Sequence, residues 1–88
     1  MTDTDFIDLL LEKMADGGLP QPVIDLVAGN AGRIYQGYTL HDPHDIVILN
    51  NKIIYLRDLA DQAGITDGSG PVPAPTAGMM LQVMRSKA

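Results

Sequence analysis

The sequence predicts an α+β fold, in which short helices pack on a small antiparallel sheet and an extended C-terminal arm leaves the domain. Two β-branched runs flank Asn50-Asn51 and indicate a tight hairpin over residues 46–56. An N-terminal segment has apolar residues at helical spacing, and a Pro- and Gly-rich stretch precedes an apolar tail. We therefore expect one domain over residues 1–66, a linker over 67–78 and a docking arm over 79–88.

Length and composition restrict the chain to one small domain and exclude several classes of function. Its 88 residues have a mass of 9.4 kDa, a net charge of −5 and a pI near 4.5. The acidic balance disfavours nucleic acid as a partner, because that affinity begins with neutralised phosphates. The absence of cysteine excludes disulfides, thiol catalysis and Cys-ligated metals. No apolar run reaches the roughly 18–20 residues of a membrane span, so we expect no membrane partner.

The first helix is predicted over residues 3–16. Thr2 is a suitable N-cap, and Gly17-Gly18 supplies a left-handed stop at the C-terminal end. Acidic residues share one narrow ridge of this helix, and apolar residues cover most of the remaining circumference. Because a surface helix usually buries an apolar stripe little more than about 100° wide, we expect neighbours on more than one side of it.

A second short helix is predicted over residues 22–28, followed by a strand over residues 33–40. Pro22 suits the first turn of a helix, and a glycine-rich segment ends that helix. Ile34 and Tyr35 favour the strand, since β-branched and aromatic side chains pack well on a pleated surface.

The predicted hairpin is apolar on both faces. A two-residue turn at Asn50-Asn51 places Ile48 opposite Ile53, and the run on each side contains β-branched residues at consecutive positions. An antiparallel sheet that is wetted on one side alternates between apolar and polar residues. This hairpin does not alternate, so we expect cover on both of its faces.

A third short helix is predicted over residues 57–63. Gly64 is the expected C′ residue, and Ile65 is expected to fold back on the last turn in a Schellman arrangement. Residues 56–66 resemble the first helix and turn of a helix-turn-helix unit. That resemblance implies, as the alternative function, a small DNA-binding regulator in which Arg57 is the candidate nucleic-acid contact. A recognition helix should then follow, but residues 67–78 hold three prolines and three glycines.

The weak candidates for a metal site are His41, His44 and Asp45. Their side chains are of the type that binds zinc or non-haem iron. All of them lie on one short turn around Pro43, whereas enclosing a cation normally takes ligands from separate elements. A polar turn is the ordinary role of such a segment. No nucleophile is paired with a base elsewhere in the chain, so we expect no cofactor and no enzymatic activity.

The predicted first helix, the hairpin and the C-terminal arm each present more apolar surface than one small core buries. Exposed apolar surfaces of this kind mark interfaces. We therefore expect a non-enzymatic, homo-oligomeric assembly module, such as a structural component of a virion or another multi-copy shell. It would lie in the cytoplasm or within the assembled particle, and its partner would be itself or another assembly protein. The predicted interface residues are Phe6, Leu10 and Met14 on the first helix and Met80, Val83, Met84 and Arg85 on the arm.

The two ends of the chain carry opposite charge. Residues 1–16 hold five acids and one lysine, whereas residues 79–88 hold Arg85 and Lys87 and no acid. Exposed ion pairs contribute at most about 1 kcal/mol each. We therefore expect these charges to set the register between an N-terminal helix and the tail of another copy, with apolar contact supplying the affinity.

Overall fold

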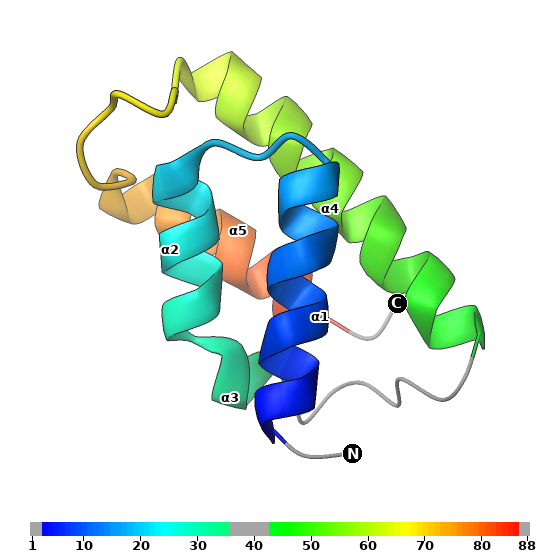
Figure 1. Cartoon of the computed structure of the whole chain (residues 1–88). Helices are drawn as coiled ribbons and strands as arrows, with labels where there is room; N and C mark the ends of the chain where they lie inside the picture. Colours follow the sequence, from blue (N-terminus) through cyan, green and yellow to red (C-terminus); the bar gives the residue numbers. More distant parts are fainter. Residues whose placement is uncertain (1–2, 36–42, 87–88) are drawn as a thin grey trace.

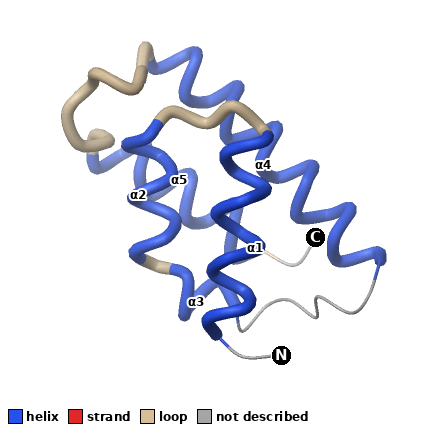
Figure 2. Tube along the Cα trace, viewed as in Figure 1, coloured by secondary structure: helices blue, strands red, loops and turns tan. Residues whose placement is uncertain are grey.

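The computed structural model describes residues 3–35 and 43–86, and this part of the chain consists of α-helices and connecting loops, with no strand (Figures 1 and 2). The predicted α+β fold is therefore wrong. The elements in chain order are α1 (Asp3–Asp16), α2 (Gln21–Gly29), α3 (Ala31–Tyr35), α4 (Pro43–Ala63) and α5 (Ala74–Arg85).

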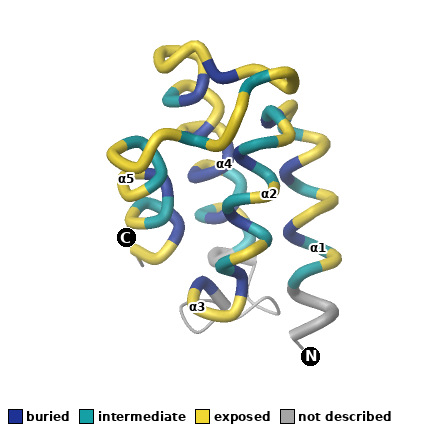
Figure 3. The backbone as a smooth tube through the Cα atoms, turned by 90° about the vertical axis from the view of Figure 1, so that its left-hand side faces the viewer, coloured by how far each residue is buried: buried dark blue, intermediate teal, exposed yellow. Residues whose placement is uncertain are grey.

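The five helices that the structure describes enclose one hydrophobic core. Helix α1 packs against α2, α3 and α4, and helix α5 packs against α4, α2 and α3. In the turned view of Figure 3, α1 and α5 lie on opposite sides of the bundle, with α2 and α4 between them. The first helix thus has neighbours on more than one side, and all of them belong to the same chain.

The predicted hairpin over residues 46–56 is wrong, because those residues lie within the single helix α4. Leu49, Ile53, Leu56 and Ala60 recur at helical spacing, and all of them are buried. The same segment is apolar at nearly every position, so its pattern is compatible with a helix as well as with strands that are buried on both faces. Burial of this stripe against the other helices decides for the helix, since β-branching and asparagine lower helix propensity by only some tenths of a kcal/mol per residue.

The predicted strand over residues 33–40 is also wrong in its described part. Residues 31–35 form α3, and residues 36–40 lie outside the described residues. Ala31 and Ile34, three residues apart, both face the core. Asn30 joins α2 to α3. Its side-chain Nδ2 donates to the Leu26 carbonyl at 2.8 Å, and its backbone carbonyl accepts from the Arg33 backbone amide at 3.1 Å.

The predicted limits of the first helix are confirmed, as is its C-terminal stop. Gly18 has a φ of 73°, its amide donates to the Ala15 carbonyl at 3.1 Å, and the Leu19 amide donates to the Met14 carbonyl at 3.2 Å. These two bonds define a Schellman motif. The motif buries Leu19 under the last turn of α1.

The same motif ends α4, as predicted. Gly64 has a φ of 71°, its amide donates to the Asp61 carbonyl at 3.2 Å, and the Ile65 amide donates to the Ala60 carbonyl at 3.0 Å. Ile65 and Ala60 are both buried. The third predicted helix is therefore the last part of a longer one, and its C-terminal end is placed correctly.

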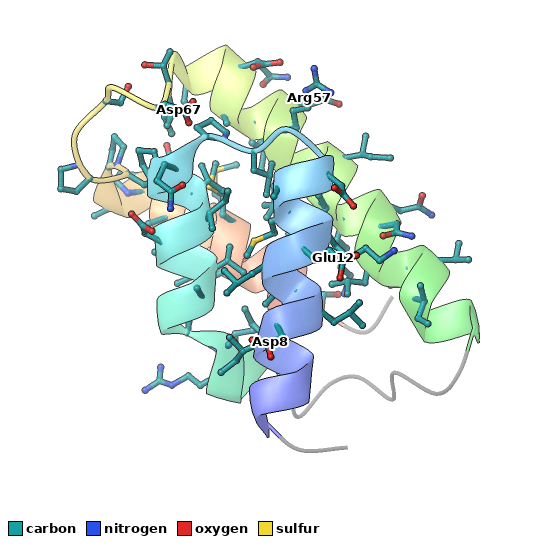
Figure 4. All side chains as sticks on the ribbon, viewed as in Figure 1. Asp8, Glu12, Arg57 and Asp67 are labelled. Atoms are coloured by element: carbon teal, nitrogen blue, oxygen red, sulfur yellow. The ribbon has the colours of Figure 1, made fainter. Side chains whose placement is uncertain are left out.

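The loop between α4 and α5 is tied to the start of α2. A side-chain oxygen of Asp67 accepts a hydrogen bond from the Gln21 amide at 2.7 Å (Figure 4). That amide begins α2 and has no partner within its own helix. Within the loop, the Thr66 amide donates to the Ser69 hydroxyl at 2.8 Å, and the Ser69 amide donates to the Thr66 carbonyl at 3.0 Å.

The extended C-terminal arm is wrong as well, because residues 79–85 are part of helix α5. This helix begins at Ala74, within the predicted linker, and Pro73 is its N-cap residue. Met80 and Met84, four residues apart, face the core and are fully buried. They join a cluster drawn from every helix of the described chain: Leu10, Met14, Leu19, Val23, Val27, Ala31, Ile34, Leu49, Ile53, Leu56, Ala60, Ile65, Met80 and Met84.

Candidate functional site

Most of the predicted interface residues lie inside the chain's own core. Leu10, Met14, Met80 and Met84 each have 0% of their surface exposed. A second copy reaches these four side chains only if α1 or α5 leaves the bundle. Of the remaining three, Val83 is half-buried beside α4, Arg85 is exposed, and the Phe6 side chain lies outside the described residues.

The exposed apolar surface lies on the side of α4 that faces away from the core. Val47, Ile54 and Tyr55 of α4 and Met79 of α5 expose between 50% and 58% of their surface. Val47, Asn51 and Ile54 follow one another at helical spacing on the outward side, and we call these three residues the α4 outer face. The predicted hairpin does not contain this face, because a hairpin distributes the same residues over two sides of a ribbon.

A groove runs between α4 and α5 next to that face, and we call it the α4–α5 groove. Its volume is about 510 Å³. Each helix contributes four residues at the spacing i, i+3, i+4 and i+7, so the two walls run lengthwise along the helices. The lining residues are Ile48, Asn51, Lys52 and Tyr55 from α4 and Met79, Gln82, Val83 and Ser86 from α5.

The charges around the groove differ in sign from the net charge of the protein. Lys52 lies in its wall and is buried, and the exposed Arg85 lines an adjoining hollow on α5 together with Gln82 and Ser86. The sequence has no acidic residue after Asp67, and residues 46–57 contain only Lys52 and Arg57 as charged residues. The groove is therefore apolar with a basic margin, on a chain whose net charge is −5.

The opposite side of the bundle carries an acidic surface. Asp8, Glu12 and Asp16 of α1 are exposed, and Leu11 and Ala15 are exposed between them. In Figure 4, α1 lies at the front of the bundle with Asp8 and Glu12 labelled on it, whereas α5 lies behind the bundle. We call these five residues the α1 outer face.

The structure does not describe the side chains of the weak metal-site candidates His41, His44 and Asp45. His41 lies outside the described residues, and His44 and Asp45 belong to the first turn of α4, with side chains outside the described residues. Elsewhere, in the described part of the chain, no group of three His, Asp or Glu side chains is arranged to hold a metal ion.

The helix-turn-helix candidate lies at the end of α4. Arg57 is exposed, and its guanidinium group lies beside Gly18 in the loop between α1 and α2 (Figure 4). After the turn at Gly64 the next helix begins only at Ala74. No helix therefore occupies the place of a recognition helix directly after that turn, in a stretch that the structure describes completely.

None of the helices in the described ranges is both long enough and apolar enough to cross a membrane. Comparison with known proteins adds no further constraint: no protein-family model, no curated protein and no solved structure gave a significant match to this chain.

Proposed function

We propose that this protein is a non-enzymatic association module that self-assembles through the α4 outer face and the adjoining α4–α5 groove. The observation that supports the proposal most directly is the position of the exposed apolar side chains. Val47, Ile54, Tyr55 and Met79 are large, are at least half exposed and come from two neighbouring helices. Such side chains gather at interfaces, where aromatic residues and methionine are enriched and charged residues are depleted.

The distribution of charge along α4 supports the same surface. Lys52 is the one charged residue between positions 46 and 56, and it is buried. The other charged residues of the helix are Asp45 in its first turn and Arg57, Asp58 and Asp61 in its last part. Because a free surface helix normally carries charges along its whole outer side, the uncharged part of α4 is the part suited to contact with another protein.

The test is the mass of the protein in solution when Tyr55 is replaced by glutamate. Tyr55 lines the groove and is half exposed, so Tyr55→Glu places a charge in the interface without opening a cavity in the core. We expect the wild-type chain to sediment as an oligomer of its 9.4 kDa chain. We expect the variant to shift toward the monomer, because association would remove the new carboxylate from water in a largely apolar interface.

Gln62→Glu is the matched control. Gln62 is exposed two turns further along the same side of α4 and outside the groove. It introduces the same charge on the same helix, and we expect it to leave the oligomer unchanged. A wild-type chain that remains monomeric at every concentration, or two variants that behave alike, would contradict the proposal.

A further inference from the structure

We propose that the α4–α5 groove of one copy holds the α1 outer face of a second copy, which gives a head-to-tail assembly. This inference rests on the proposed self-association and names the surface that fills the groove. Three observations support it: the opposite charges of the two surfaces, the exposed side chain of Leu11 on α1, and the placement of the two surfaces on the bundle.

Charge complementarity is the first reason. The exposed charge at the margin of the groove is Arg85 on α5, and the buried Lys52 adds a second positive charge in the wall on α4. The α1 outer face presents Asp8, Glu12 and Asp16 at a spacing of four residues along one side of a helix. On a chain with a net charge of −5, these surfaces attract each other, whereas two copies of the acidic face repel.

The second reason is the position of Leu11. Among the residues whose side chains the structure describes, five large apolar side chains are exposed, and Leu11 is the one outside α4 and α5. It lies beside Ala15 next to the acids of α1. A helix with an apolar strip next to a ridge of acids is the kind of ligand that binds in an apolar groove with a basic margin. A single interface would then cover Leu11 together with Tyr55 and Met79.

The third reason is the placement of the helices that carry the two surfaces: α1 and α5 lie on opposite sides of the bundle (Figures 1 and 3). The α1 outer face of a copy therefore does not reach its own α4–α5 groove, and each copy offers one of each surface to its neighbours. Contact between two different surfaces is heterologous. Such contacts build rings or open chains of copies, whereas a two-fold contact stops at a dimer.

A charge exchange between the two surfaces tests this inference. We expect Glu12→Lys and Arg85→Glu each to lower the association constant by about three- to tenfold, since each turns an attraction into a repulsion. We expect the double variant to recover to within about twofold of the wild type, because the exchanged pair is again of opposite sign. Sedimentation equilibrium at low and high salt measures these constants, and thermal unfolding shows that each variant is folded.

Asp61→Lys and Arg33→Glu are the matched controls. Both residues are exposed and lie outside both surfaces, on α4 and α3. They change the net charge by the same amounts as Glu12→Lys and Arg85→Glu, so they separate local pairing from the overall charge. We expect neither to change association by more than about twofold at 0.1 M salt, where screening acts over about 10 Å. If Arg85→Glu lowers stability, Arg85→Gln provides the milder change.

The outcomes separate this inference from the proposed function. An average mass that rises past twice 9.4 kDa with concentration, together with recovery in the double variant, supports head-to-tail assembly. Association that Tyr55→Glu weakens but the charge variants leave unchanged overturns this inference alone. A mass that levels off at the dimer likewise overturns the head-to-tail contact. A wild-type chain that stays monomeric overturns both proposals.

Discussion

Gly17 and Gly18 are both required at the end of α1, for different physical reasons. Gly18 has a φ of 73°, a conformation that a side chain makes costly. Gly17 lies where α1 approaches α4 closely: a Cβ atom there would be 2.7 Å from Cγ2 of Ile53. The first glycine thus permits contact between two helices, and the second permits the turn that leads into α2.

Alanine substitutions at Gly64 and Gly78 show how backbone conformation alone affects stability, because neither position has a neighbouring atom that a methyl group would contact. A methyl group at either position meets no atom within 4 Å, but only Gly64 has a positive φ, of 71°. We expect Gly64→Ala to lower the free energy of unfolding by about 1 to 2 kcal/mol. We expect Gly78→Ala, within α5, to raise it by about 0.5 to 1 kcal/mol, because glycine is a poor helix former. Urea denaturation measures both, and equal effects would contradict the assigned backbone.

At the scale of the element, α4 shows how one segment can fit two secondary structures. Ile48 and Ile53 face each other in a hairpin with a turn at Asn50-Asn51, whereas in the helix Ile53 is buried and Ile48 lines the groove. Local propensity does not decide between these arrangements, since β-branched residues only mildly disfavour a helix. The helix is selected because one stripe of it packs against α1 and α5.

Asn51→Ala distinguishes the two arrangements by the sign of its effect. Asn51 is exposed within α4, and alanine is the better helix former, so we expect stability to rise by about 0.5 kcal/mol. In a hairpin turn the same change would be destabilising, because alanine disfavours the positive φ that the turn requires. Thermal unfolding of wild type, Asn51→Ala and Asn51→Gly gives the order, and in the helix glycine should be the least stable of the three.

At the scale of the whole molecule, the first and the last helix are packed into one core. Met14 near the N-terminus and Met84 near the C-terminus are both fully buried in the same cluster. The loop ahead of α5 is held to α2 by Asp67. Helix α5 is thus a component of the folding unit, and only its outward side is available to a partner.

A chain that ends at Gly70 tests this role of α5. It lacks Met80 and Met84, so the stripes of α2 and α4 that they cover would be exposed to water. We expect it to lose cooperative unfolding and most of its helical circular dichroism, since a domain of this size has little stability to spare. A folded truncated chain that only assembles less well would instead show that residues 71–88 are an arm.

Two single substitutions provide the control for the truncation. Met84→Ala should cost about 2 to 5 kcal/mol, the range for truncating a fully buried methionine. Met79→Ala, on the half-exposed side of the same helix, should cost less than about 1 kcal/mol. Comparable losses at the two positions would contradict the placement of α5.

The sequence by itself determined the features that depend on neighbouring residues. The limits of α1, the left-handed glycine at each Schellman motif and the fold-back of Ile65 were all predictable, because their hydrogen bonds span six residues or fewer. The acidic ridge of α1 was also predictable, since helical spacing alone places its carboxylates on one side.

Only the tertiary structure decided the features that depend on distant residues. Residues 46–56 are a helix, and Leu10, Met14, Met80 and Met84 are core, because segments far apart in sequence bury one another's apolar stripes. The same packing decided which apolar side chains stay exposed, among them Tyr55 and Met79, and so where a partner can bind. Burial is a property of the assembled bundle, and an apolar pattern that is compatible with both a helix and buried strands does not specify which surface will be covered.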